Sequence, residues 1–304
     1  MNNRYAEIAD KAWRLFVVYL PYLWLLLFFL TPFLIVFKIS FSDPVIAQPP
    51  FTPLFDWTKN GVNALYVTFD NFVFLFEDDL YWSSYLKSVR VAAVSTFCCL
   101  VIGYPMAYAI TRAKTTTRNI LLLLVILPFW TSFLLRVYAW MGMLSTHGLI
   151  NKGLLSIGLI DEPMKLLYTD FAVYLGIVYA YLPFMVLPLY AALQRLDLSM
   201  HEAASDLGAT PFRVFIDITL PMSSAGIIAG CLLVFIPAIG EYVIPALLGG
   251  ADSLMIGRQL FNEFFENRDW PVASAVATIL LFILVIPIML FQRYQITDGT
   301  SGNE

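Results

Sequence analysis

The chain has 304 residues, of which 60% are hydrophobic and 13% are charged, and its net charge is −4 at pH 7. A soluble domain carries about 25% charged residues, so this composition excludes an ordinary water-soluble protein, and the negative balance argues against a nucleic-acid partner. The cysteines Cys98, Cys99 and Cys231 lie in apolar runs, which favours buried free thiols over disulfides or metal ligands. The sequence therefore predicts an all-α, polytopic membrane protein.

Six apolar runs are long enough to cross a membrane as helices. They cover about residues 16–39, 84–110, 119–141, 171–194, 222–248 and 272–292. The first run is too long for the core of a signal peptide, and no small-residue cleavage site follows it, so we expect an uncleaved span. An even number of spans places both termini on the same side of the membrane.

Basic residues indicate which side this is. The connection 112–118 carries Arg112, Lys114 and Arg118 without an acid, and further basic residues precede the first span. Positive charge in short loops marks the cytoplasmic side, so both termini are expected there. The expected domains are a cytoplasmic tail over 1–15, a transmembrane domain over 16–295 and a cytoplasmic tail over 296–304.

The segment 40–83 is long for a loop and is rich in proline and aromatic residues. It predicts an ordered extracytoplasmic cap that contains short helices. Together with the other outward segments, 142–170 and 249–271, it carries more acids than bases. An acidic outer mouth would concentrate cations, although the rule that depletes outer loops of basic residues explains the same bias without any function.

A polar interruption, "HEAASDLGATPFRVFIDITLP" over 201–221, separates the fourth and fifth apolar runs. Ser199 and Glu202 have the spacing of a capping box, which predicts a helix start at Ser199. One face of that helix is apolar: Met200, Ala203, Ala204 and Leu207. Gly208 predicts the left-handed helix end, and Thr210 with Pro211 predicts the start of a second helix. The result is a helix, a tight turn and a helix on the cytoplasmic side.

Three kinds of site could use such an element. A zinc peptidase helix needs His-Glu-x-x-His, but Ser205 stands where the second histidine belongs. A DNA-reading helix-turn-helix needs basic residues, but Arg213 is outnumbered by acids here. The third possibility, a helix that inserts into a groove on a soluble partner, is compatible with the pattern.

The same stretch resembles a known family loop. Glu202-Ala203-Ala204, Gly208, Ile218 and Leu220-Pro221 match the EAA loop of ABC-transporter importer permeases at every fixed position. The resemblance implies six transmembrane helices of the MetI-like type I fold and a coupling loop over 196–221 that seats in a cleft of a cytoplasmic ABC ATPase dimer. The residues it implies for ATPase coupling are Ser199, Met200, Glu202, Ala203, Ala204, Leu207, Gly208 and Arg213.

The wider chain, about residues 18–292, is similar to the polyamine branch of that family and most closely to its putrescine type. The matching stretches are "RNILLLLVILPFWTSFLLRVYAWMG", "GIVYAYLPFMVLPLY", "FIPAIGEYVIPALLGG" and "NRDWPVASA". The resemblance implies transport of putrescine or spermidine across a bacterial inner membrane, a second homologous permease subunit and a periplasmic polyamine-binding protein. Asp269 and Trp270, at the outer start of the last span, are a candidate contact for that delivery protein. No G-x-x-x-x-G-K-[ST] occurs, so the chain is not expected to be an enzyme, and ATP and Mg are expected on the ATPase subunit.

Ionisable residues inside spans are expensive and mark functional sites. Arg136 and Glu241 are expected at similar depths in the outer part of the membrane, where they could form an ion pair. Alternatively, Glu241 lies on the substrate path and attracts an ammonium group. Pro237, Gly240 and Pro245 would then loosen the helix around it, as in the discontinuous helices of transport sites.

Aromatic faces suit a polyamine, a flexible cation with methylene segments. Trp130, Tyr138, Tyr179, Trp140 and Tyr181 could supply them, although an interfacial belt or ordinary packing is the simpler explanation for any single one. Two other functions are weaker alternatives to a polyamine permease: an ABC permease for another small cationic or organic solute, and an ion-coupled secondary transporter, whose usual inverted repeats are not evident.

Overall fold

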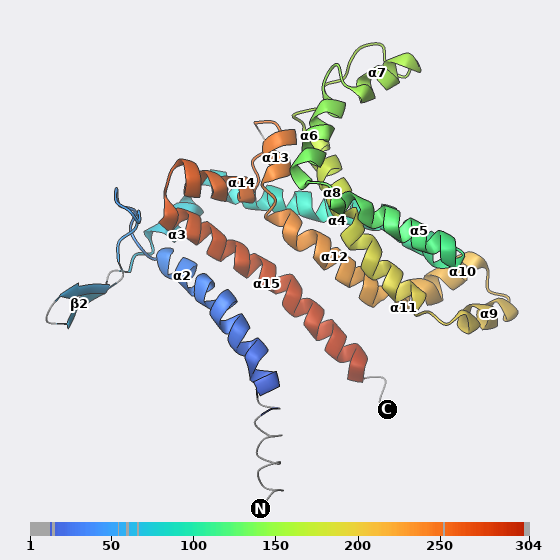
Figure 1. Ribbon diagram of the computed structural model, residues 1–304, viewed down its shortest axis with the longest axis horizontal. Helices are drawn as coiled ribbons and strands as arrows, with labels where there is room; N and C mark the ends of the chain where they lie inside the picture. The colour runs from blue at the N-terminus through green and yellow to red at the C-terminus, as the bar shows by residue number, and fades with distance from the viewer. Residues whose placement is uncertain are drawn as a thin grey trace, which may run out of the picture. The chain divides into compact units, whose positions relative to one another are not determined.

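The computed structural model describes residues 13, 16–53, 55–58, 61–65, 67–251 and 253–300. The chain divides into two compact units, whose helices and strands Figure 1 labels and colours in chain order. Unit one comprises Met1–Asp78 and Asn262–Leu281, and unit two comprises Asp79–Phe261 and Phe282–Glu304. Most of the expected tail 1–15 lies outside the described residues, and the expected tail 296–304 begins inside a helix that ends at Thr300.

Unit one contains the first apolar run and the segment after it. The candidate span Phe16–Ile39 includes the π-helical turn η1 (Leu26–Leu30) and α2 (Thr31–Ile39). The cap contains the short helix α3 (Asp70–Glu77), as expected for this segment. It also contains an antiparallel hairpin, β1 (Phe55–Thr58) with β2 (Gly61–Leu65), which the sequence did not predict. Farther along the chain, η4 (Asn262–Glu266) and the first part of α15 (Trp270–Thr300) complete the unit.

All the regular secondary structure among the described residues of unit two is helical. Its elements in chain order are α4 (Asp79–Arg112), α5 (Thr115–Ile126), η2 (Leu127–Trp130), α6 (Phe133–Leu144), α7 (Leu149–Ser156), α8 (Asp170–Gln194), α9 (Leu198–Asp206), α10 (Pro211–Val214), η3 (Phe215–Thr219), α11 (Leu220–Met222), α12 (Ser224–Ile239), α13 (Val243–Leu248) and α14 (Ile256–Phe261). The last part of α15 also belongs to this unit.

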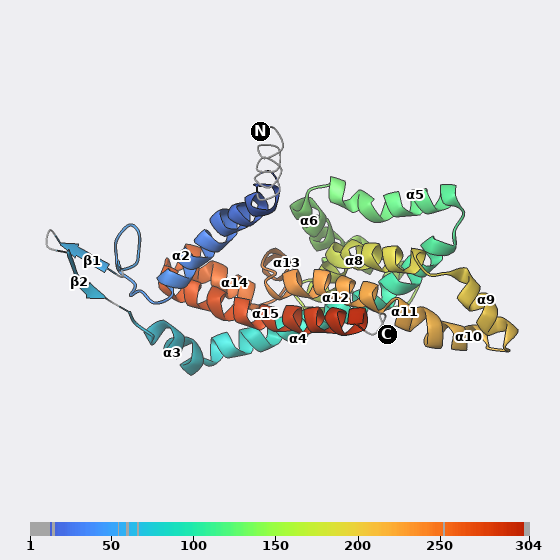
Figure 2. The same ribbon diagram turned by 90° about the horizontal axis from the view of Figure 1, so that it is seen from below.

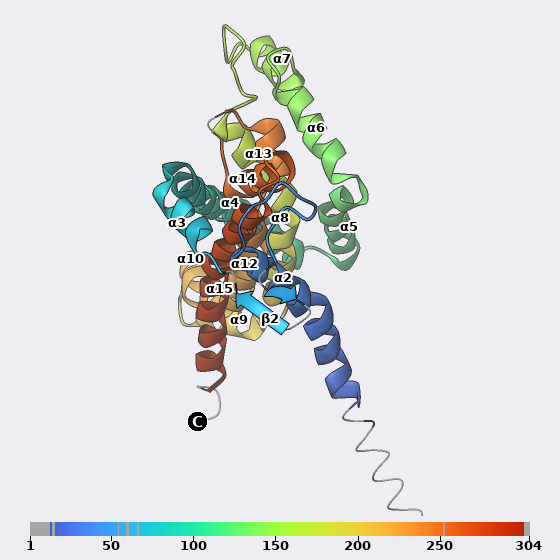
Figure 3. The same ribbon diagram turned by 90° about the vertical axis from the view of Figure 1, so that its left-hand side faces the viewer.

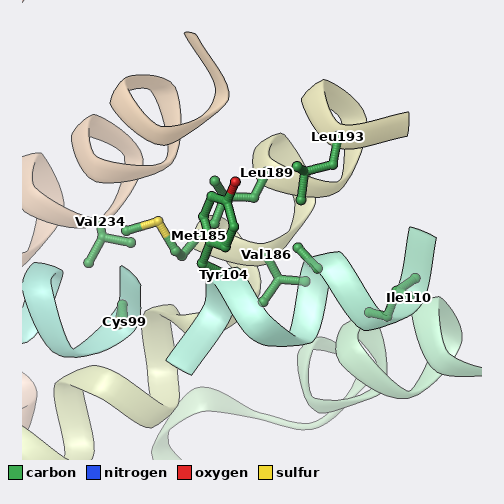
Figure 4. Packing of buried hydrophobic residues seen from close by; sticks show 9 residues of the cluster. Cys99, Tyr104, Ile110, Met185, Val186, Leu189, Leu193 and Val234 are labelled. Atoms are coloured by element: carbon green, nitrogen blue, oxygen red, sulfur yellow. The ribbon is translucent and has the colours of Figure 1, made fainter. Parts of the chain in front are cut away.

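The core of unit two lies where α4, α8 and α12 pack together (Figures 1 and 4). Met185 of α8 is fully buried at the centre of this cluster. A Cβ atom added to Gly230 of α12 would lie 2.7 Å from Met185 Sδ, and one added to Gly226 would lie 2.9 Å from the Pro188 carbonyl. Without a hydrophobic driving force in lipid, small residues let helix backbones approach closely. The pair Gly226 and Gly230, one turn apart, therefore makes this contact possible.

Within the described residues, four helices are long and apolar enough to cross a membrane, and two bent pairs bring the number of candidate spans to six. This agrees with the predicted fold class. The expected third span, 119–141, is wrong as one continuous helix. It breaks after Trp130, and the two parts are bent by 92° (Figure 3). Pro128 lies in the 3-10 turn η2, and Thr131 then takes an extended conformation before α6 starts.

The expected fifth span, 222–248, is also broken. Helix α12 ends at Ile239, and α13 starts at Val243. The backbone N–H of Glu241, between them, bonds only weakly to Ala238 O, at 3.4 Å. The prediction that the helix would be discontinuous around Glu241 is confirmed.

Candidate functional site

The first helix of the interrupting stretch, α9, begins at Leu198, so its N-cap lies two residues earlier than expected. Its N-cap is Asp197, whose Oδ1 accepts a hydrogen bond of 2.9 Å from the Ser199 N–H. The prediction of a capping box that starts at Ser199 is therefore wrong, because Ser199 lies inside the first turn. This hydrogen bond to the charged carboxylate lowers the pKa of Asp197, which keeps a negative charge at the positive end of the helix.

The turn after α9 has the geometry that the sequence predicts. Gly208 adopts φ +85°. Its N–H bonds to Ser205 O at 2.9 Å, while the Ala209 N–H bonds to Ala204 O at 3.0 Å. These two bonds make a Schellman motif, which needs a left-handed residue. Thr210 Oγ1 then accepts from the Arg213 N–H and caps α10, so the predicted helix, turn and helix are confirmed.

The apolar face of α9 is open. Leu207 is 89% exposed and Met200 is 46% exposed. Ala203 is exposed and Ala204 is half-buried. Figure 2 shows α9 and α10 next to each other beyond the ends of α8 and α11. Side chains of this kind are normally buried, so the face formed by Met200, Ala203, Ala204 and Leu207, hereafter the α9 face, is suited to a protein partner.

His201 connects α9 to the rest of unit two. Its Nδ1 lies 3.4 Å from an amino nitrogen of Arg112 at the end of α4, and its Nε2 lies 3.1 Å from Thr219 Oγ1 in η3. Because a guanidinium group can only donate, Nδ1 is the acceptor and Nε2 carries the proton. The same Arg112 nitrogen also donates to Tyr108 Oη at 3.1 Å. These contacts connect α9 to the end of α4 and to η3.

A second connection runs from η3 into the core. Phe215 packs edge-on against Tyr104 of α4, with ring centroids 5.5 Å apart. Tyr104 Oη also lies 2.9 Å from Ser223 Oγ, at the junction of α11 and α12. Pro221 has no N–H to continue the α-helical pattern, which accounts for the π-helical turn of η3 just before it. The coupling loop is therefore attached to two of the three core helices.

The second candidate site is the break around Glu241, whose side chain is only 8% exposed. Glu241 Oε1 accepts from the backbone N–H groups of Val243 at 3.0 Å and Ile244 at 3.3 Å, which caps α13. Its Oε2 accepts from Tyr181 Oη of α8 at 2.5 Å. Gly257 lies against the break, since a Cβ there would be 2.3 Å from the Gly240 carbonyl. The carboxylate is thus fully engaged within the chain.

Arg136 and Glu241 do not form an ion pair in the part of the chain that the structure describes. The Arg136 guanidinium lies instead over the rings of Phe129 and Phe133, 5.8 and 5.7 Å from their centroids. The ring centroids of Phe129 and Phe184 are 5.1 Å apart, and those of Phe184 and Tyr181 are 6.0 Å apart. Tyr181 in turn donates its hydrogen bond to Glu241. Aromatic rings therefore connect the two charges, and we call Phe129, Phe184 and Tyr181 the aromatic chain.

The other aromatic candidates lie differently. Trp130 is 74% exposed and Tyr138 is 53% exposed, and neither ring contacts the aromatic chain within the described residues. Tyr179 packs edge-on against Trp140, with centroids 5.4 Å apart. Sequence reasoning missed Phe129 and Phe184. The available signal was that each directly follows a proline, Pro128 and Pro183, inside an apolar run.

Comparisons with known proteins cover most of the chain. A family model described as "Binding-protein-dependent transport system inner membrane component" matches residues 99–296. A spermidine/putrescine transport system permease protein PotB of Haemophilus influenzae is 37% identical over 96% of this chain and 95% of its own length. The protein of the same name in Escherichia coli strain K12 is 38% identical over 89% of this chain and 93% of its own length. The resemblance to polyamine permeases is confirmed.

Solved structures show the same fold. A chain of a bacterial ABC transporter that imports the acidic polysaccharide alginate has a TM-score of 0.69 and 19% identity, and the match covers 95% of this chain and 99% of that one. At this identity the likeness concerns the fold alone. The MetNI methionine ABC transporter in an inward-facing conformation matches with a TM-score of 0.53 over 71% of this chain.

Proposed function

This chain belongs to the family of binding-protein-dependent transport system inner membrane components and is a permease subunit of an ABC importer, and from this premise we propose that its substrate is a polyamine, putrescine or spermidine. The observation that carries the proposal is the identity of 37–38% with spermidine/putrescine permeases over nearly the whole chain. That identity covers both the coupling loop and the segment around Glu241.

The coupling loop would receive the force that drives transport. The α9 face would seat in a groove of a cytoplasmic ATPase subunit, which places α9, and with it both chain termini, on the cytoplasmic side. Closure of the ATPase dimer on ATP would move α9. His201 would transmit this movement to Arg112 in α4, and Phe215 would transmit it to Tyr104. The packed helices α4, α8 and α12 would then change access from one side of the membrane to the other.

The region of Glu241 supports a path for a cation. A buried carboxylate within a broken apolar helix offers the negative charge that an ammonium group needs after it leaves water. The rings of Tyr181, Phe184 and Phe129 offer faces for cation–π contacts along the methylene chain of the substrate. An arriving ammonium group would have to compete with Tyr181 and the α13 backbone for Glu241, so binding there would be coupled to a change in the break.

The remaining subunits would supply what this chain lacks. ATP and Mg would be bound by the ATPase subunits, a periplasmic polyamine-binding protein would deliver the substrate, and a second homologous permease would complete the membrane part. Asp269 and Trp270 lie in unit one next to Arg268, a residue with positive φ. Burial raises the pKa of Asp269, and Glu263 raises it further. We place the contact with the delivery protein at this segment.

The test is uptake of labelled putrescine and spermidine in cells that lack this chain, with and without its gene supplied from a plasmid. The proposal expects uptake only when both this chain and its ATPase are present. Uptake that survives deletion of the ATPase would mean an ion-coupled transporter. Uptake of another cationic solute in place of both polyamines would leave the ABC permease intact and overturn the substrate.

A further inference from the structure

A basic pocket lies at the end of unit two that carries the coupling loop, apart from the α9 face and the Glu241 region. Its volume is about 540 Å³. The basic pocket is lined by Tyr108 and Arg112 of α4, Arg118 of α5, Leu193 of α8 and His201 of α9. None of its described lining residues is acidic. Two guanidinium groups therefore share a cavity without a carboxylate to balance them.

The Arg118 guanidinium is held at the wall of the pocket by backbone carbonyls, and one of its donors has no partner among the described residues. One of its amino nitrogens donates to the carbonyls of Thr111 and Ala113, at 3.3 and 3.2 Å, which holds the side chain across the turn between α4 and α5. Its Nε is buried and has no hydrogen-bond partner among the described residues. An unsatisfied buried donor on a charged group is costly, and a bound anion is one of its common explanations.

The position of the pocket identifies the kind of anion. Apart from Leu196 and from His201 of α9, its lining comes from the ends of α4 and α8 and the first turn of α5, which belong to candidate membrane spans. Such ends lie at the level of lipid headgroups. Part of the lining is apolar, from Leu193, Leu196 and the Tyr108 ring, which suits a group that is charged at one end and attached to an acyl chain.

A partner seated on the α9 face contacts a different side of α9 from the one that lines this pocket. Successive residues of an α-helix are rotated by about 100°, so His201 lies roughly a quarter-turn or more away from the centre of the α9 face. A partner bound to Met200 and Leu207 therefore leaves the pocket side of α9 free. An acidic side chain of that partner remains the main competing occupant, and the experiment below separates it from a lipid.

We propose that the basic pocket binds the phosphate group of an anionic phospholipid, and that this lipid fixes α9 relative to α4 and α5. Arg112 and Arg118 would pair with the phosphate, and Arg112 would keep its contact with His201. Basic pockets between transmembrane helices on the cytoplasmic side are suited to such headgroups. The inference rests on the proposed function only for placing this end of the helices at the inner leaflet.

The test is native mass spectrometry of the delipidated full-length chain titrated with phosphatidylglycerol or with phosphatidylethanolamine. Phosphatidylglycerol is expected to bind more tightly. Arg112→Gln and Arg118→Gln should each weaken it about tenfold, since each removes charge-assisted hydrogen bonds to the phosphate. Lys114→Gln is the matched control, because it removes a positive charge from the exposed start of α5 without lining the pocket. Size-exclusion chromatography checks folding, and Arg112→Gln serves if Arg118→Gln fails to fold, since Arg112 is exposed.

Three outcomes would overturn the proposal. The first is equal binding of the two lipids, or an equal loss in Lys114→Gln. The second is competition by inorganic phosphate as effective as that of the lipid, which would assign the pocket to a free anion. The third is a pair of arginine variants that bind lipid normally but no longer bind the ATPase, which would assign it to an acidic side chain. None of these results depends on which substrate is transported, so they leave the proposed function untouched.

Discussion

The coupling loop and the Glu241 break are both interruptions of apolar helices, but they are built in opposite ways. The coupling loop is exposed and held by local motifs: the Asp197 cap, the Schellman motif at Gly208 and the Thr210 cap. The Glu241 break is buried and held by contacts from distant segments, Tyr181 and Gly257. An exposed apolar face between two capped helix ends is suited to a partner outside the chain, whereas a buried carboxylate in a broken helix is suited to a substrate.

The variant with the largest expected effect on uptake tests whether the shape of the coupling loop matters for transport or only for local stability. Gly208→Val should abolish polyamine uptake, since a β-branched residue in the left-handed conformation costs about 1–2 kcal/mol and opens the turn. Gly158 is the matched control. Gly158 follows the end of α7 with φ +69°. It has the same two hydrogen bonds as the Gly208 turn, from the Gly158 N–H to the Leu155 carbonyl and from the Leu159 N–H to the Leu154 carbonyl.

Gly158→Val therefore carries the same backbone strain in another loop, and a Cβ meets no neighbour at either glycine. Uptake is measured together with the amount of chain in the membrane fraction. Equal losses of uptake in the two variants would show that strain alone, and not the coupling loop, decides the result.

The next effect concerns the buried site. Glu241→Gln keeps an oxygen that can cap α13 but removes the charge. Uptake should fall at least tenfold, because a hydrogen bond to a charged group contributes about 1.5–3 kcal/mol. Tyr181→Phe keeps the ring of the aromatic chain and removes only the hydroxyl group, so its loss should be smaller. Initial rates of uptake over a range of spermidine concentrations give the loss of uptake in each of the two variants.

The double variant Arg136→Gln with Glu241→Gln completes this test. Since Arg136 and Glu241 do not pair, the second change should not restore uptake. If Glu241→Gln kept wild-type uptake, the carboxylate would serve only to cap α13. If adding Arg136→Gln restored the uptake lost in Glu241→Gln, the two residues would form an ion pair after all.

The smallest effect concerns the N-cap of α9. Asp197→Ala removes the acceptor for the Ser199 N–H and should lower uptake by a few fold at most, whereas Asp197→Asn keeps an uncharged acceptor and should lose less. The Ser199 N–H lowers the pKa of Asp197 in the folded loop. The stabilisation is thus present at neutral pH and is lost as the pH falls below the ordinary aspartate value of about 4.

The stimulation of ATPase activity in the reconstituted complex, measured as a function of pH, tests whether the stabilisation by Asp197 is lost in acid. The wild type and the alanine variant should differ at neutral pH and converge in acid. A difference that grows in acid would contradict the role of the ionised carboxylate.

The sequence predicted correctly most of the features that depend on local contacts, and it failed for those that depend on contacts between distant segments. Gly208, Thr210 and Pro211 act through their own backbone neighbours, so their positions were predicted correctly. The capping box at Ser199 was wrong because Asp197, two residues earlier, offers a better acceptor. The pairing of Arg136 with Glu241 assumed straight helices, and the 92° bend after Trp130 removes the basis for comparing their depths. Phe129 and Phe184 gain their role only from tertiary packing, which no local pattern records.

The most direct test of the account is a photocrosslinking amino acid at Leu207, the most exposed residue of the α9 face, in cells that contain the whole transporter. Leu159, which is 68% exposed beyond α7, takes the same crosslinker as a control. The account predicts a crosslink from position 207 to the ATPase subunit, with a yield that changes when ATP is bound, and none from position 159. A crosslink from position 207 only to lipid, or none to the ATPase in any nucleotide state, would contradict it.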